Sequence, residues 1–202
     1  QLLVIAQMEI SIAKAVKQHF EDIGHDIKNH DETYENSQAR ERTQILMDLS
    51  NKLFALVVGT GDLSELALGW ATYNGDHMSM YGLNAAIPKT LIQYLIRYIA
   101  ALPKSSAERD VPLDIVNTPI SPELPPADAK GNIQQKTSDL VGPYELHDFF
   151  LYYMLRFGFS PVKIILMAEK AFGNSYDKAT LKKWLTTFCR RFFAQQFKRS
   201  CL

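Results

Sequence analysis

The sequence has few cysteines, no net charge and no long hydrophobic run, and each shortage excludes a class of protein. Only Cys189 and Cys201 occur, without the spacing of a metal or redox pair, so we expect reduced thiols in a cytosolic protein. Lys and Arg number 22 and so do Asp and Glu, which leaves no overall field to gather nucleic acid or anionic lipid. No apolar run approaches the roughly 20 residues that span a bilayer, and the first residues lack the features of a signal peptide. We therefore expect a cytoplasmic protein without membrane or nucleic-acid partners.

Hydrophobic residues account for 47% of the 202 residues, enough to form the core of one ordinary domain. A three-to-four residue spacing predicts helices at residues 13–23, which Gly24 ends, and at residues 37–53. The inward face of the second helix is expected to hold Ile45, Leu46, Leu49 and Leu53. The continuous apolar run at residues 54–58 predicts a parallel strand buried on both faces. A helix, a strand and a following Gly-Thr-Gly indicate an α/β protein.

The rest of the chain divides into one helix, a proline-rich segment and a helical carboxyl-terminal region. Residues 90–102 are expected to form a helix, because prolines stand on both sides of them. Residues 103–143 hold seven of the nine prolines and show little periodicity. Loops of this length are usually functional, so we predict a mobile lid. From Tyr144 the spacing predicts only helices, at residues 146–157, 161–172 and 178–198.

A glycine-rich turn at residues 57–65 follows the predicted strand. Where a buried strand ends in glycines and a helix begins, amides and hydroxyls gather at the carboxyl edge of the sheet, a common ligand site. Thr60 is placed there to contact a nucleotide. Glu65 falls in the first helical turn, where it either caps the helix or, beside a polyphosphate, binds magnesium.

Other polar residues have a simple structural interpretation beside a functional one. Asp76 after a glycine is typical of a turn. Lys89 at a helix start is typically solvated, although a cation there opposes the helix dipole and so favours an anion nearby. The His-Asp pairs at residues 25–26 and 30–31 could bind metal, but they lie in a polar turn segment. The basic tail at residues 190–199 could suit nucleic acid, whereas the helical spacing of its phenylalanines favours core packing.

Long stretches of the chain resemble glutamine-dependent NAD synthetases and occur in that family's order. The most specific are Gly-Thr-Gly-Asp-Leu-Ser-Glu at residues 59–65, Gly-Pro-Tyr-Glu-Leu-His-Asp-Phe-Phe at 142–150 and Phe-Lys-Arg at 197–199. The full set of similar segments is 25–26, 33–48, 58–76, 87–90, 118–124, 139–150 and 190–199. The resemblance covers essentially the whole chain. By this resemblance the chain corresponds to the carboxyl-terminal part of the family's synthetase domain.

The resemblance implies a partial Rossmann-like fold of the ATP-pyrophosphatase (adenine nucleotide alpha-hydrolase-like) type with a parallel sheet, followed by a helical region at residues 144–202. It also implies ATP-dependent amidation of deamido-NAD. In that reaction the nicotinate carboxylate is adenylated, pyrophosphate leaves, and ammonia from glutamine displaces AMP to give NAD. Such chemistry needs a polyphosphate cradle with Mg²⁺, a dinucleotide pocket and exclusion of water from the adenylate.

The same resemblance implies roles for individual residues. The ATP contacts would be Thr60, Lys89 and Ser121, and the Mg²⁺ ligand would be Glu65. The deamido-NAD pocket would comprise Arg40, Trp70, Asp76, Asp139 and Lys198. Arg40 would pair with charge, Trp70 would stack on the pyridine ring, and Lys198 would close the site. Asp76, which would orient ammonia, and Ser121, which would contact the leaving pyrophosphate, are the catalytic candidates.

One feature of the family is absent from all 202 residues. The Ser-Gly-Gly-x-Asp-Ser loop, which binds pyrophosphate through backbone amides, is expected upstream of Gln1, and the glutaminase domain that supplies ammonia further upstream. We therefore expect the chain alone to be inactive. We also expect homo-oligomers, because the exposed edge of a parallel sheet associates readily. Two alternatives stay open: another ATP-pyrophosphatase-type amidotransferase, such as a GMP or asparagine synthetase, and a non-enzymatic helical interaction module.

Overall fold

The computed structural model describes residues 7–102, 106–118 and 140–199. Its elements are α1 (Ala13–Ile23), α2 (Glu32–Leu53), β1 (Val58–Asp62), α3 (Leu63–Leu68), β2 (Tyr81–Asn84), α4 (Lys89–Ala101), α5 (Ser106–Asn117), α7 (Tyr144–Phe157), α8 (Pro161–Phe172), α9 (Lys178–Ala194) and the 3₁₀ helix η1 (Gln196–Arg199). The helices predicted at residues 13–23 and 161–172 are confirmed to the residue, and the one predicted at 90–102 is confirmed with a shift of one position. None of the described helices has the length and hydrophobicity needed to cross a membrane.

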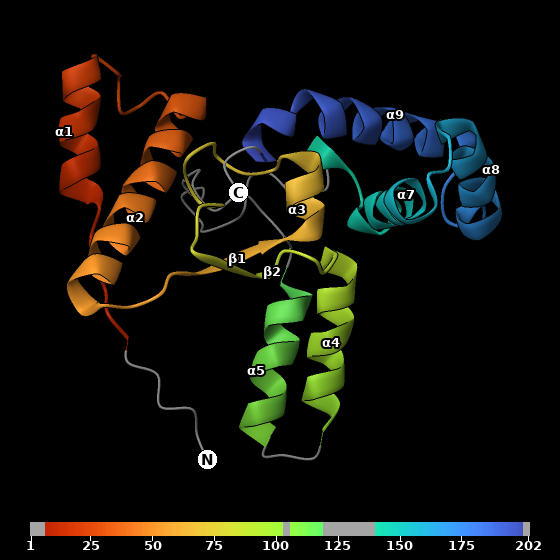
Figure 1. The fold of residues 1–202 in the computed structure, drawn as a ribbon, viewed down its shortest axis with the longest axis horizontal. Helices are drawn as coiled ribbons and strands as arrows, with labels where there is room; N and C mark the ends of the chain where they lie inside the picture. The colour runs from red at the N-terminus through yellow and green to blue at the C-terminus, as the bar shows by residue number, and fades with distance from the viewer. Residues whose placement is uncertain (1–6, 103–105, 119–139, 200–202) are drawn as a thin grey trace.

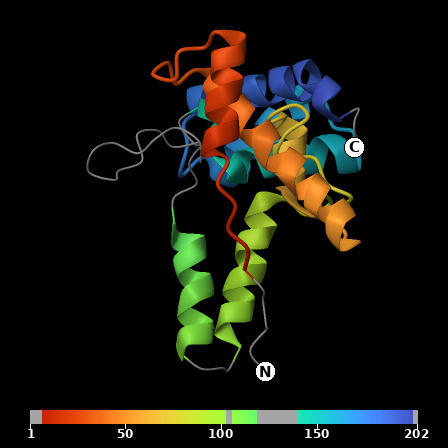
Figure 2. The same ribbon diagram turned by 90° about the vertical axis from the view of Figure 1, so that its left-hand side faces the viewer.

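The helices surround a small sheet in three groups (Figure 1). α1 and α2 pack on each other on one side, α7, α8 and α9 form a bundle on the other, and α3 connects the sheet to this bundle. α4 and α5 form a helical hairpin that projects away from the other elements, as a second view also shows (Figure 2). The chain is therefore an α/β protein whose carboxyl-terminal region is helical, as the sequence predicts.

The sheet consists of β1 and β2, which pair in parallel with Gly59 opposite Gly82 and Asp62 opposite Asn84. The register shifts between Gly59 and Asp62, so β1 is irregular just before α3 begins. Position 59 requires glycine, because a Cβ atom there would lie 2.3 Å from Ser79 Oγ. This close approach brings the start of β1 and the loop before β2 together.

The strand predicted at residues 54–58 was wrong in both position and burial. Phe54 ends α2 in a left-handed conformation with φ of 50°, and its side chain is 97% exposed. The strand begins only at Val58 and runs to Asp62. A continuous apolar run is buried on both faces only where other strands and helices cover it. In the described part of the chain β1 pairs with β2 alone, which leaves this run without such cover.

α2 begins five residues before its predicted start, because Asp31 caps it. The Asp31 carboxylate accepts hydrogen bonds from the backbone N–H groups of Thr33 (2.8 Å) and Tyr34 (3.1 Å). His25 lies beside this cap, with Nε2 3.7 Å from Asp31 Oδ1. The second His-Asp pair therefore belongs to the turn that starts a helix, which agrees with its structural interpretation.

The expected inward stripe of α2 was wrong for two of its four residues, because Ile45 and Leu49 are half-buried but the other two are exposed. Leu46 is 50% exposed and Leu53 is 57% exposed. The buried residues of this helix are the small side chains Ser37, Ala39 and Ser50. The closely covered positions of α2 therefore carry small side chains rather than leucines.

Part of the predicted lid is a regular helix. α5 occupies Ser106–Asn117 although Pro112 lies inside it. Proline removes one helical hydrogen bond, but α5 packs along the whole of α4, and this packing outweighs the local preference. The remainder of the predicted lid, residues 103–105 and 119–139, lies outside the described residues, so the lid stays a prediction.

The main hydrophobic core lies between α3 and the carboxyl-terminal helices. Phe150 on α7, Ile164 on α8 and Phe188 on α9 are fully buried in it. The predicted helix at 178–198 is α9 followed by η1, and the apolar stripe on α9 packs into the core as far as Phe192, whereas Phe193 is 65% exposed. The core thereby fixes α3 against α7 and α9.

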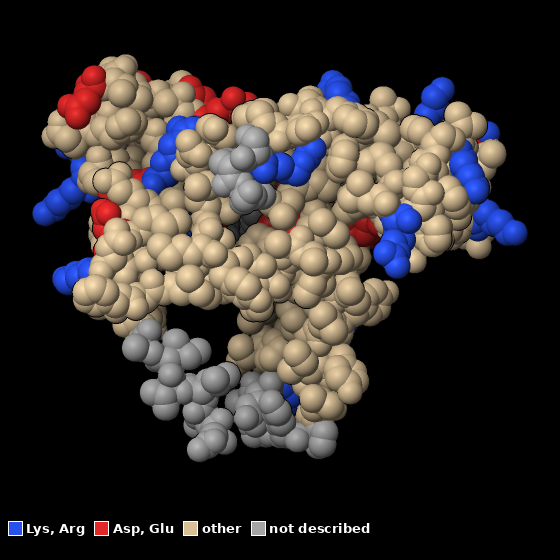
Figure 3. Space-filling view, viewed as in Figure 1, with Lys and Arg blue, Asp and Glu red and all other residues tan. Residues whose placement is uncertain are grey.

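Charge is segregated along the chain although the total is zero. Residues 144–199 contain ten Lys and Arg but only four Asp and Glu. Basic side chains gather over α8 and α9 on the face shown in Figure 3. The overall balance therefore conceals a local cationic surface at one end of the molecule.

Candidate functional site

Two reciprocal hydrogen bonds close the turn between β1 and α3. Asp62 Oδ1 accepts from the backbone N–H of Glu65 at 2.9 Å, and Glu65 Oε2 accepts from the backbone N–H of Asp62 at 3.2 Å. This capping box satisfies two amides at the start of α3. The capping interpretation of Glu65 is confirmed, and a role in binding magnesium stays a prediction. Thr60 lies inside β1, two residues before the strand ends.

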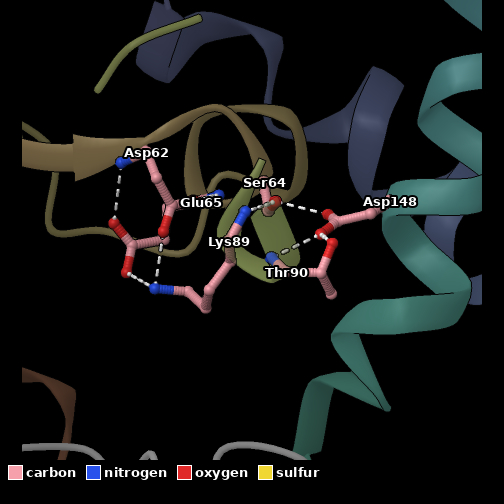
Figure 4. A network of polar contacts seen from close by, with 6 residues as sticks. All are labelled: Asp62, Ser64, Glu65, Lys89, Thr90 and Asp148. Atoms are coloured by element: carbon pink, nitrogen blue, oxygen red, sulfur yellow. Dashed lines mark hydrogen bonds and ion pairs between the residues drawn. The ribbon is translucent and has the colours of Figure 1, made fainter. Parts of the chain in front are cut away.

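Lys89, the first residue of α4, lies against the same two carboxylates (Figure 4). Its Nζ is 2.6 Å from Asp62 Oδ2 and 2.8 Å from Glu65 Oε1, and its side chain is only 16% exposed. Burial lowers the pKa of Lys89, but the charges of Glu65 and Asp62 outweigh burial and hold it above its ordinary value. Burial, followed by the charge of Asp62, raises the pKa of Glu65. Lys89 is therefore not a solvated lysine, and the anions beside it are carboxylates of the chain itself.

A cavity of about 470 Å³ opens beside this turn. Its volume lies in the range typical of ligand pockets, roughly 300–1,000 Å³. Four of the predicted site residues line it: Thr60, Glu65, Asp76 and Lys198. They come from β1, α3, the loop before β2 and η1, so only the folded chain brings them together.

Asp76 combines its turn interpretation with a position on the cavity wall. Its Oδ1 accepts a hydrogen bond from the backbone N–H of Thr72 at 2.7 Å, as expected of a turn carboxylate. The side chain is nevertheless exposed and lines the cavity. The structure thus supports both interpretations of this residue at once.

The remaining predicted site residues are not on the cavity wall or are not described. Arg40 Nε donates to the carbonyl of Tyr73 at 3.2 Å. Trp70 packs against the main core, and the guanidinium of Arg191 lies 5.2 Å from its ring centroid. Ser121 and Asp139 lie outside the described residues, so their expected roles stay predictions.

Three cations of the tail bind the carbonyl end of α3. The hydrogen bonds run from Arg191 to Leu68 (3.0 Å), from Arg199 to Leu66 and Ala67 (3.1 Å each), and from Lys198 to Gly69 (3.0 Å) and Ala71 (2.6 Å). Such groups satisfy carbonyls that have no partner within a helix. Burial lowers the pKa of each of the three cations. These contacts give the basic tail a structural role, in agreement with the packing interpretation.

Several residues of the cavity wall were not predicted from the sequence. Arg42 and Thr43 line the cavity with Ala39, and all three share one face of α2 at helical spacing. This spacing is visible in the sequence, but it becomes informative only when the face of α2 that lies toward the cavity is known. His77, whose Nδ1 lies 2.8 Å from the Thr72 carbonyl, and Arg199 also line the cavity, and no local pattern distinguished them.

Neither the thiols nor a histidine cluster adds a second chemical centre in the described part of the chain. No three His, Cys, Asp or Glu side chains gather there as a protein-only metal site would require. Cys189 is partly buried, and burial raises the pKa of its thiol. Cys201 lies outside the described residues. The cavity beside β1 and α3 is therefore the candidate site.

Comparisons with known sequences agree with the motifs at this site. A model of the NAD synthase family matches residues 1–174. A glutamine-dependent NAD(+) synthetase from Mycobacterium leprae is 40% identical over 217 residues, covering 96% of this chain and 32% of the relative. The protein of that name from Mycobacterium tuberculosis is 41% identical over 218 residues with the same coverage. The chain thus spans about a third of the length of these curated relatives.

Solved structures agree on the fold. A glutamine-dependent NAD(+) synthetase from Cytophaga hutchinsonii has a TM-score of 0.65 at 24% identity, covering 95% of this chain and 28% of that one. An NMN synthetase from Francisella tularensis has a TM-score of 0.64 at 21% identity, covering 95% and 63%. At these identities the likeness shows the fold alone, and it confirms the predicted partial Rossmann-like α/β class. Because the family model matches most of the sequence, the chain belongs to the NAD synthase family.

Proposed function

We propose that the chain is the carboxyl-terminal part of the synthetase domain of a glutamine-dependent NAD synthetase. The protein that contains it would amidate deamido-NAD to NAD with ATP and with ammonia derived from glutamine. The observation that carries the proposal is the cavity where Thr60, Glu65, Asp76 and Lys198 meet. The two mycobacterial relatives, which bear this name and align with 96% of the chain, add independent support.

The turn between β1 and α3 is the side of the cavity proposed for the triphosphate. Thr60 offers a hydroxyl on the cavity wall. Lys89 lies behind the wall residue Glu65 and offers an ammonium held 2.8 Å from its carboxylate. An ammonium has three N–H donors, so Lys89 can keep a carboxylate partner while it donates to a phosphate oxygen. Ser121 is assigned to the leaving pyrophosphate by resemblance.

The residues at this turn fit a magnesium ion that takes most of its ligands from phosphates and water. Mg²⁺ in nucleotide sites is usually bound through one or two carboxylates, and Glu65 lines the cavity with Asp62 beside it. When bound, the ion would supply neutralisation of charge on the polyphosphate. Glu65 would hold it after giving up part of its contact with Lys89.

Another part of the cavity wall is proposed for deamido-NAD. Lys198 and Asp76 lie on its wall, and Arg40, Trp70 and Asp139 are assigned to the dinucleotide by resemblance. The nicotinate carboxylate would attack the α-phosphate of ATP and release pyrophosphate. Ammonia would then displace AMP from the acyl-adenylate, and the exposed carboxylate of Asp76 would accept a hydrogen bond from the ammonia and orient it.

The direct test is product formation by the full-length protein. We expect NAD to form from deamido-NAD and ATP with either glutamine or ammonia as the nitrogen donor, with AMP and pyrophosphate as the other products. Chromatography with mass detection identifies all three. Preferential amidation of nicotinate mononucleotide, offered in a parallel assay, to NMN would instead place the protein with the mononucleotide-forming neighbour. Amidation of neither substrate would overturn the proposal.

Self-association in the cytoplasm completes the proposal. In the described part of the chain the parallel pair β1 and β2 has no further strand, and open strand edges favour contacts with another copy. We expect the 202-residue chain to form a homo-oligomer in sedimentation velocity at micromolar concentration. A monomer under those conditions would contradict this part alone.

A further inference from the structure

A third carboxylate lies behind the two that bind Lys89. Asp148, on the second turn of α7, points toward the starts of both α3 and α4 (Figure 4). Asp148 is only 8% exposed, and among the described residues no charged side chain forms an ion pair with it. Buried carboxylates are costly unless hydrogen bonds compensate, so the partners of Asp148 explain its presence.

The partners of Asp148 are groups at two helix starts. Ser64 Oγ donates to Asp148 Oδ1, while the backbone N–H and the hydroxyl of Thr90 donate to Oδ2 at 2.9 Å and 2.6 Å. Ser64 Oγ in turn accepts from the backbone N–H of Lys89 at 2.8 Å. The first turns of two helices, which favour negative charge, thus converge on one carboxylate.

The two residues that Asp148 binds are next in sequence to two residues of the candidate site. Ser64 precedes Glu65 on α3, and Thr90 follows Lys89 on α4. Asp148 binds one member of each neighbouring pair, and the other two members, Glu65 and Lys89, meet at 2.8 Å. The spacing of the two helix starts, and hence the distance between Glu65 and Lys89, is therefore fixed from behind by Asp148.

We propose that Asp148 is a positioning residue for ATP: it aligns Glu65 and Lys89 through Ser64 and Thr90 without touching the substrate. The inference rests on the proposed function of the same site. Replacing the carboxylate with an amide removes an acceptor and leaves at least one donor at a helix start without its partner. Glu65 and Lys89 would then lose their common alignment toward the triphosphate.

The test compares Asp148→Asn with wild type in the full-length protein, using initial rates of NAD formation. We expect KM for ATP and the half-saturating Mg²⁺ concentration to rise about tenfold, the usual scale for a lost hydrogen bond to a charged group, while KM for deamido-NAD changes less than twofold. A merely structural role would change KM for both substrates to a similar extent. Equal changes for both substrates, or none, would overturn the inference.

Milder variants keep the test decisive if Asp148→Asn does not fold. Thr90→Val removes only the hydroxyl donor. Ser64→Ala removes the hydroxyl that joins Asp148 to the Lys89 amide but leaves both Thr90 donors in place. Each variant should raise KM for ATP in the same selective way. Asp177→Asn is the matched control, because Asp177 caps α9 at Thr180 and is remote from both helix starts. It should lower stability without changing KM for ATP.

The outcomes separate the inference from the proposed function. Calorimetry of ATP binding with Mg²⁺ should show weaker binding in Asp148→Asn at a temperature where both proteins are folded. A wild-type protein that binds ATP but forms no NAD contradicts the proposed function alone. An active wild type whose Asp148→Asn variant binds and uses ATP equally well contradicts the inference alone.

Discussion

Glu65 takes part in a helix cap, an ion pair and the wall of the cavity. Glu65→Gln keeps its size but removes the charge that a magnesium ion requires. In the full-length protein we expect the adenylation rate to fall by about a hundredfold or more, the usual scale for charge-stabilising groups. Pyrophosphate release in single turnovers measures this step.

Glu145→Gln is the control for this change, because Glu145 also lies in the first turn of a helix, α7, but does not line the cavity. It should leave adenylation near the wild-type rate. A wild-type adenylation rate for Glu65→Gln would show that Glu65 only caps α3.

His147 is a buried residue whose charge state depends on the fold. Its ring is 1% exposed, Nε2 donates to the Val141 carbonyl at 2.7 Å, and burial lowers its pKa to about 4. The folded protein therefore keeps the ring neutral where the unfolded chain, with an ordinary pKa of 6.5, binds a proton. Stability contributed by the neutral ring is present above pH 6.5 and decreases as the pH falls toward 4.

We expect this linkage to remove up to roughly 3 kcal/mol of unfolding free energy between pH 7 and pH 4. Urea unfolding of the wild type and of His147→Gln at several pH values measures the difference, and the variant should lose most of this dependence. His19→Gln, at an exposed position, should retain it. Identical pH profiles for all three proteins would show that His147 is not the group responsible.

At the scale of elements, α3 is the shortest α-helix that contributes to the site, with six residues, and it depends on its neighbours. Its amino end is held by the capping box and its carboxyl end by Arg191, Lys198 and Arg199. A helix this short is not stable alone. The tail therefore contributes to the site by holding α3 in place.

Arg191→Ala should destabilise the protein by about 1.5–3 kcal/mol, because it removes a hydrogen bond from a charged group and uncovers the face of Trp70. Hydrogen exchange should show faster opening of the amides of α3. Arg190→Ala is the control, since Arg190 is exposed and adjacent in sequence. Equal exchange in the two variants would contradict a role of the tail in holding α3.

The elements also show where local patterns suffice and where they fail. α1 and α8 begin and end as predicted, because a glycine or a proline marks their ends and their apolar spacing is regular. The run at 54–58 carries the same composition as a buried strand, but burial depends on what covers it. α5 was missed because the prolines of residues 103–143 suggested a loop, whereas packing along α4 decides its helical state.

At the scale of the whole molecule, the 202-residue chain by itself contains only part of the proposed triphosphate cradle. Its sequence has no Ser-Gly-Gly-x-Asp-Ser segment, whose amides would bind pyrophosphate. We expect the isolated chain to bind ATP weakly and to form no NAD from deamido-NAD, ATP, Mg²⁺ and ammonia, as mass detection of the products would show. NAD formed by a preparation of this mass would mean that the catalytic centre has been misplaced.

The linear sequence was sufficient for the family and for most helix boundaries. It also singled out Thr60, Glu65, Asp76 and Lys198, which line the cavity and whose roles stay predictions. Motif order and helical periodicity are properties of neighbouring residues, and they need no knowledge of the fold. Contacts between distant segments could not be foreseen in this way. The pairing of Lys89 with Asp62 and Glu65, the link from Asp148 to two helix starts and the exposure of Phe54 all depend on which elements lie side by side, because burial and electrostatic pairing are set by neighbours in space.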